Sequence, residues 1–106
     1  MRDLMGIMKQ AQAMQQKVQA VQEELDRLEV EGSSGGGMVK VVLTAKGQAK
    51  SLRIDPSLLI PEEAEIVEDL VVAALSDARQ KADRAAQEKM EEVTKGLPLP
   101  PGLKLF

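Results

Sequence analysis

The chain has 106 residues, enough for one domain, and its 14 Lys or Arg against 17 Asp or Glu give a net charge of −3. It contains no Cys, His, Trp or Tyr and only one Phe. This composition excludes disulfides, thiol and imidazole catalysis, and thiolate or imidazole metal sites. We therefore expect no enzymatic activity, no cofactor, no metal and no small-molecule substrate.

An apolar heptad pattern covers residues 1–28 and predicts a long helix that pairs with another helix. All eight a and d positions are apolar over four heptads. The a positions are Leu4, Ala11, Val18 and Leu25, and the d positions are Ile7, Met14, Val21 and Leu28. We call this row of side chains the seam, and we expect Val18, Val21 and Leu25 to lie in a helix or dimer interface.

Three short antiparallel strands are predicted within residues 29–55. The segments that alternate with period two are 28–31, 38–44 and 49–55, separated by a Ser/Gly-rich stretch at 32–37 and a turn at 45–48. Alternation places Val39, Val41 and Leu43 on one face of the middle strand, and Leu52 and Ile54 on one face of the last. We expect the Ser/Gly-rich stretch to be a flexible turn.

A phosphate-binding loop is the alternative interpretation of residues 33–37, and the sequence argues against it. The stretch lacks the Gly-Lys-Ser/Thr ending of that motif. It also lies between two predicted strands, whereas the motif joins a strand to a helix.

A second long helix is predicted over residues 61–95. Pro61 suits a first helical turn, and Gly96 is suited to end the helix. Alanines dominate the middle of its apolar stripe, so a partner helix could approach closely at Ala78 and Ala82, which we place in the same helix or dimer interface.

The remaining residues, 96–106, form a Pro-rich apolar tail. We expect Leu97, Leu99 and Phe106 to pack on the surface of a protomer, because an apolar segment left free would promote aggregation.

Element lengths indicate an α+β protein with projecting helices. A compact domain of this size is roughly 34 Å across, whereas the second helix alone would be about 50 Å long. We expect both helices to extend beyond the sheet as arms. A three-stranded sheet with two such arms cannot cover its own apolar surface, which predicts a twofold homodimer.

The charge pattern leaves two interpretations open, and the first is that the helical arms bind phosphates. The candidate contacts are Lys9, Lys17, Arg79, Lys81 and Arg84, whereas acidic residues are concentrated at 23–31 and 62–69. Without an aromatic stacking platform, a nucleic-acid partner would be a duplex held by its backbone. The alternative is that the charges pair with one another, Glu23 or Glu24 with a Lys or Arg, and bind no ligand.

A series of short motifs resembles the YbaB/EbfC family of bacterial nucleoid-associated proteins. The motifs are Met-Lys-Gln-Ala-Gln at 8–12, Leu-Glu-Val-Glu-Gly at 28–32, Val-Lys-Val at 39–41, Ile-Asp-Pro-Ser-Leu-Leu at 54–59, Glu-Asp-Leu-Val at 68–71 and Leu-Pro-Pro-Gly at 99–102. They occur in the family's order over nearly the whole chain, so the resemblance predicts that residues 1–106 form a single domain of this type.

The resemblance implies a small cytoplasmic homodimer with tweezer-like helical arms, located at the nucleoid. It implies binding of double-stranded DNA with low sequence specificity, a change in DNA conformation, and roles in nucleoid organisation and gene regulation. The chain has no apolar run long enough to cross a membrane and no visible signal peptide, so no membrane partner is expected. The alternative function is a coiled-coil adaptor or chaperone-like clamp that binds proteins.

Overall fold

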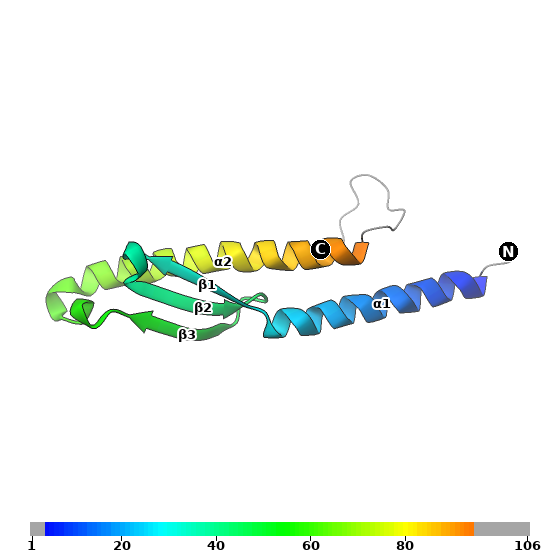
Figure 1. The fold of residues 1–106 in the computed structure, drawn as a ribbon, viewed down its shortest axis with the longest axis horizontal. Helices are drawn as coiled ribbons and strands as arrows, with labels where there is room; N and C mark the ends of the chain where they lie inside the picture. Colours follow the sequence, from blue (N-terminus) through cyan, green and yellow to red (C-terminus); the bar gives the residue numbers. More distant parts are fainter. Residues whose placement is uncertain (1–3, 95–106) are drawn as a thin grey trace.

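The computed structural model describes residues 4–94, which form an elongated molecule with principal dimensions of 72 × 25 × 16 Å (Figure 1). The main elements in chain order are α1 (Leu4–Arg27), β1 (Glu29–Ser34), β2 (Val39–Thr44), β3 (Ala49–Ile54) and α2 (Ala64–Thr94). The radius of gyration is 19.8 Å, whereas a compact domain of about 100 residues has about 13 Å. The predicted α+β fold, with helices that extend beyond the sheet, is confirmed.

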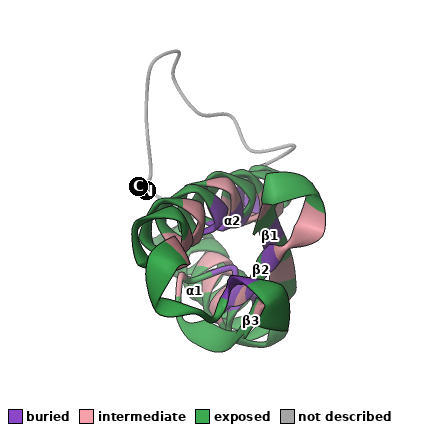
Figure 2. Cartoon of the chain, turned by 90° about the vertical axis from the view of Figure 1, so that its left-hand side faces the viewer, coloured by how far each residue is buried: buried purple, intermediate pink, exposed green. Residues whose placement is uncertain are grey.

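The sheet is antiparallel in the order β1-β2-β3, and α2 packs across one face of it, mainly over β1 and β2. The predicted alternation in β2 is confirmed, since Val39, Val41 and Leu43 are buried. They share a core with Ala74 and Ala78 of α2. In Figure 2 the buried residues of α2, β1 and β2 face each other, while β3 is exposed over most of its length.

The prediction that residues 32–37 form a flexible turn is wrong for the first half of this segment. β1 continues through Ser34, whose hydroxyl donates to the Leu70 carbonyl at 2.6 Å. Only Gly35–Gly37 form the turn, a short 3-10 segment in which all three glycines have positive φ. Glycine adopts these angles without the steric cost of a Cβ atom. The turn joins β1 to β2 and not to a helix, as predicted.

Two hydrogen bonds to Asp55 form directly after the end of β3. Its Oδ1 atom accepts hydrogen bonds from the Ser57 backbone N–H at 2.9 Å and from the Ser57 hydroxyl at 2.7 Å. Both hydrogen bonds lower the pKa of the Asp55 carboxyl, and the bond from the Ser57 backbone has the larger effect. Short 3-10 turns at Pro56–Leu58 and Pro61–Glu63 then lead into α2.

The alanine stripe of α2 faces the sheet at Ala74 and Ala78, and not another helix as the sequence suggested. Both alanines are fully buried, and Gly32 of β1 lies against the backbone of α2 at this point. A small residue on each element permits this close approach. Ala82, one turn later, is also buried.

The C-terminal parts of α1 and α2 pack antiparallel against each other within one chain (Figure 1). We call α1 together with the C-terminal part of α2 the arm. The buried residues between the two helices are Val21, Leu25, Met90 and Val93, joined by Ala45 of the turn after β2, with Met14, Val18 and Leu28 partly buried against them. The heptad pattern thus predicted helix pairing correctly, and the partner along this part of the seam is the chain's own second helix. Within residues 4–94, one chain therefore has a single two-helix arm.

Candidate nucleic-acid interface

The two candidate lysines of α1 are exposed on the arm. Lys9 and Lys17 make no ion pair or hydrogen bond within residues 4–94. On a helix with 3.6 residues per turn, Lys9 faces away from the seam and Lys17 lies at its border. Both ammonium groups are therefore available to a ligand in solution.

Lys81 is held by neighbouring groups. Its Nζ atom lies 3.1 Å from an Asp77 carboxylate oxygen and donates to the Glu31 backbone carbonyl at 2.9 Å. The Asp77 carboxylate also accepts the Ser33 N–H at 3.0 Å. The bond from Ser33, followed by that from Lys81, lowers the pKa of Asp77. Lys81 and Asp77 thus fasten α2 to β1, and only part of the lysine's donor capacity is open to a ligand.

Arg84 follows Lys81 by three residues and shares its face of α2, whereas Arg79 lies about 200° from Lys81 around the helix. The guanidinium group of Arg79 lies beside the turn between β2 and β3, where a Cβ atom on Gly47 would be 3.4 Å from its Nη1 atom. Arg84 is exposed and has no ion pair within the described part of the chain. The five candidates therefore do not converge on one patch; they are spread over the arm and the adjoining part of α2.

A second basic site lies on the open face of the sheet. Lys40 of β2 pairs in register with Arg53 of β3, and both are exposed. Directly opposed residues on neighbouring strands have Cβ atoms about 5 Å apart, so the two cationic side chains leave the sheet side by side. Both residues are visible as cations in the sequence, but their pairing depends on the strand register. Neither was placed among the five candidates.

Ion pairs occupy several charges at the base of the arm. Glu24 lies 3.2 Å from Lys89, and Asp26 lies 3.4 Å from Lys46. The neighbouring Glu24 carboxylate raises the pKa of Lys89. The predicted pairing of an acidic residue at 23–24 with a distant cation is therefore confirmed for Glu24. Lys46 and Lys89 are therefore already paired with carboxylates and are less available to a ligand.

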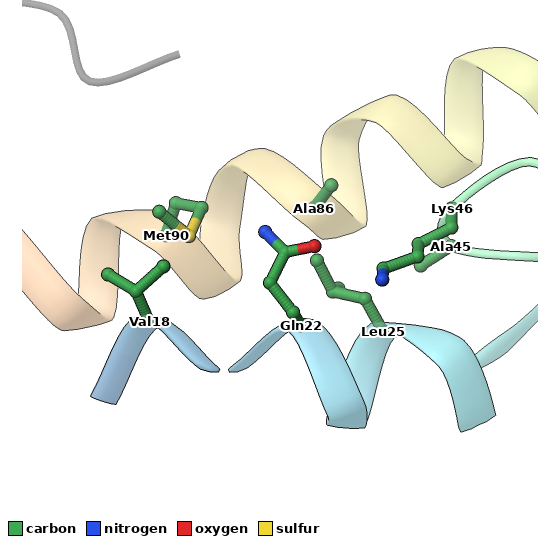
Figure 3. Close-up of a pocket in the computed structure, with 7 residues that line it drawn as sticks. All are labelled: Val18, Gln22, Leu25, Ala45, Lys46, Ala86 and Met90. Carbon is green, nitrogen blue, oxygen red and sulfur yellow. The ribbon is translucent and has the colours of Figure 1, made fainter. Parts of the chain in front are cut away.

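A shallow apolar hollow of about 300 Å³ lies between α1, α2 and the turn after β2 (Figure 3). Its lining residues are Val18, Gln22, Leu25, Ala45, Lys46, Ala86 and Met90. Figure 3 shows Val18 and Met90 on facing helices, the Gln22 amide between the two helices, and Lys46 to one side on the turn after β2. The lining has no carboxylate or hydroxyl, and residues 4–94 contain no cluster of three acidic side chains that could hold a metal.

A second apolar groove, of about 360 Å³, lies where α2 leaves β3 uncovered. Its lining residues are Val41, Ala49, Lys50, Ser51, Leu52, Val71 and Leu75. Leu52 is 51% exposed although it pairs with the buried Val41, because α2 does not extend over this edge of the sheet. Leu52 and Ile54 pair with Val41 and Val39, which confirms that the two residues share one face of β3. Ile54 is partly buried against the core, whereas Leu52 is exposed. The sequence did not predict the groove, because strand alternation alone does not say which strand a helix covers.

No helix within residues 4–94 is long and apolar enough to cross a membrane.

Comparison with known proteins identifies relatives along nearly the whole chain. Residues 1–97 match the model of the YbaB/EbfC DNA-binding family. A nucleoid-associated protein of Methylocella silvestris is 60% identical over 99% of this chain and 98% of its own length. Another, from Agrobacterium fabrum, is 54% identical over 99% of this chain and 98% of its own length.

A solved structure shows the same fold. The crystal structure of an uncharacterized protein from Helicobacter pylori superposes with a TM-score of 0.75 at 24% sequence identity. The match covers 87% of this chain and 97% of that one. The helix–sheet–helix arrangement described above is therefore shared with a protein of low sequence similarity.

Proposed function

The chain belongs to the YbaB/EbfC DNA-binding family. From this we propose that the protein binds double-stranded DNA at the nucleoid with low sequence specificity and changes the conformation of the DNA. Organisation of the nucleoid and regulation of gene expression follow from such binding, and no catalytic step is involved. The observation that carries the proposal is the set of unpaired cations on the arm, Lys9, Lys17 and Arg84.

Contacts to the DNA backbone account best for this distribution of charge. Phosphate contacts position a protein on the duplex without reading its sequence. Cations spread along an arm suit a repeating row of phosphates, whereas base reading needs several side chains directed into one groove. The exposed glutamines of α1, including Gln12 and Gln16, can add neutral hydrogen bonds to the same backbone. Arg79 and the partly occupied Lys81 would contact DNA where it passes from the arm towards the sheet.

We further propose that two chains form a homodimer through the groove beside β3. β3 is an edge strand with an exposed apolar residue, Leu52, and Leu75 of α2 borders the same groove. Exposed edge strands next to apolar surface favour pairing with another chain. A twofold copy would cover this surface, present two arms to one duplex and double every cation. Val18, Val21 and Leu25 would then stabilise each arm internally.

A salt titration tests the DNA proposal. Binding to two duplexes of unrelated sequence is measured between 50 and 200 mM salt for the wild type and for Lys9→Ala/Lys17→Ala. Log affinity falls with log salt by about 0.9 for each phosphate contact, so losing four lysines in a dimer should flatten the slope by about 3 to 4. Affinity should decrease equally for both duplexes.

The matched control removes two lysines that are already paired. Lys46→Ala/Lys89→Ala changes the net charge equally, but these lysines bind Asp26 and Glu24. The control should keep most of the wild-type slope. Equal slopes in the two double mutants would remove α1 from the DNA contact. A wild type without DNA affinity at low salt would instead support the protein-clamp function.

A further inference from the structure

The first half of α1 carries an apolar stripe that no described residue covers. Leu4 is 65% exposed and Ile7 61%, and Ala11 is also exposed. These residues continue the seam at helical spacing, so they lie on the same face of α1 as Met14 and Val18, which pack on α2. Figure 1 shows α1 continuing past the last described residues of α2 on this side. We call these three residues the tip stripe.

The antiparallel register of the arm fixes how far the tip stripe lies from the end of α2. Val18 lies opposite Met90, and Gln22 lies near Ala86 (Figure 3). Each residue towards the N-terminus of α1 therefore matches one residue towards the C-terminus of α2, so Met14 lies level with Thr94. At 1.5 Å per residue, Ile7 lies about 10 Å and Leu4 about 15 Å beyond that level.

The chain continues after Thr94 with a segment that fits these distances. Residues 95–106 include Leu97, Pro98 and Leu99, followed by two further prolines. Proline and the residue before it favour extended backbone, which advances about 3.1 Å per residue. Leu97 would reach about 9 Å and Leu99 about 16 Å from Thr94. These values match the positions of Ile7 and Leu4.

We propose that Leu97 and Leu99 of the same chain dock on the tip stripe and continue the α1–α2 interface. The interface already includes Met90 and Val93 immediately before this segment. Attachment to α2 gives the segment an effective concentration of the order of millimolar at the stripe, whereas a second chain must reach it by diffusion. The proposed dimer groove lies beside β3, so both contacts can form in one molecule.

Docking would fasten the outer half of the arm without covering its proposed DNA-binding side. Ile7 and Lys9 are two residues apart, which places their side chains about 200° apart around α1. The tail would then hold the outer half of α1 against the end of α2 and leave Lys9 facing outward. This contact does not depend on DNA binding.

Disulfide trapping tests the proposal, because the chain has no cysteine of its own. Ile7→Cys/Leu97→Cys is compared under mild oxidation with the matched pair Lys9→Cys/Leu97→Cys. Docking should make the first pair close within one chain about tenfold faster than the second, since a free tail would visit both positions at similar effective concentration. Equal rates, or a cross-link between chains in the first pair, would overturn the proposal.

A second measurement uses the otherwise native sequence. The chain has four isoleucines, at positions 7, 54, 60 and 66, so labelling only the isoleucine δ1 methyl groups gives four NMR signals. Removing residues 96–106 should shift the Ile7 signal more than those of Ile54, Ile60 and Ile66. Unchanged signals from Ile54, Ile60 and Ile66 would show that the rest of the truncated protein keeps its fold. An unchanged Ile7 signal would overturn the proposal even if the truncated protein remains folded.

Discussion

Gly32 of β1 lies directly against Ala78 of α2: a Cβ atom at residue 32 would come within 2.6 Å of the Ala78 Cβ atom and closer still to the backbone of α2. Two small residues thus let the helix sit directly on the strand. Because α2 is drawn to the β1 side of the sheet, Leu52 of β3 is left without a helix above it. The close contact at one edge and the apolar groove at the other edge have the same cause.

Replacing Gly32 with alanine should therefore destabilise the fold. The added methyl group meets the backbone of α2, which cannot rotate away, and overpacking of this kind costs about 1–3 kcal/mol. Urea unfolding followed by circular dichroism measures the loss. Ser33→Ala is the control, because the Ser33 side chain is exposed and makes no hydrogen bond with the described residues, so its effect should stay within about 0.5 kcal/mol. Equal stability of the two variants would show that α2 shifts freely away from β1.

Local patterns were sufficient to predict the elements of this fold. The alternation of Val39, Val41 and Leu43 defined the buried face of β2, and the heptad positions of α1 indicated a paired helix. The partner of each apolar row was not predictable. An antiparallel helix of the same chain and a helix of a second chain require the same seam, and an alanine stripe accepts a close strand as well as a close helix.

The candidate interface was predictable only as a list of exposed cations. The contact of Lys81 with the Glu31 carbonyl joins residues 50 positions apart, and the pairing of Lys40 with Arg53 depends on strand register. Both are products of tertiary structure, so sequence position alone could not separate a lysine that fastens α2 to β1 from one that is free for DNA.

Acidification should weaken the contact that Asp77 makes with Ser33 and Lys81. The folded-state pKa of Asp77 is lowered below 3.8, so its stabilising effect is complete above that value and is lost as the pH falls through the folded pKa. Wild type should therefore have a higher free energy of unfolding than Asp77→Asn at pH 7, and this difference should narrow below about pH 4. Urea unfolding at a series of pH values measures the difference.

Asp83→Asn is the control for the same series. Asp83 is exposed and makes no ion pair or hydrogen bond within residues 4–94. Its variant should follow the wild-type stability curve across the acidic range. A gap between wild type and Asp77→Asn that stays constant down to the most acidic pH would rule out the carboxylate as the source of the stabilisation.

Charge in the groove beside β3 should dissociate the proposed dimer. Leu75→Glu places a carboxylate where a second chain would exclude water, which is costly without a partner. Ala73→Glu is the matched control, since Ala73 is exposed on α2 about 200° away from Leu75. Sedimentation at micromolar concentration should give a folded monomer for Leu75→Glu and a dimer for Ala73→Glu and wild type. A wild-type monomer would refute the dimer, and a dimeric Leu75→Glu would place its interface elsewhere.

Two cations of α2 should respond differently to removal, although both were candidates for DNA contact. Arg84 has no partner in the described part of the chain, whereas Lys81 already binds Asp77 and the Glu31 carbonyl. Arg84→Ala should reduce the salt slope of DNA binding by about 2 in a dimer, at about 0.9 for each phosphate contact. Lys81→Ala should change the slope less and lower the urea midpoint more, because it releases α2 from β1.

Titrating one duplex with both variants, which have the same net charge, compares them directly. A Lys81→Ala slope as flat as that of Arg84→Ala would mean that Lys81 leaves Asp77 to bind DNA.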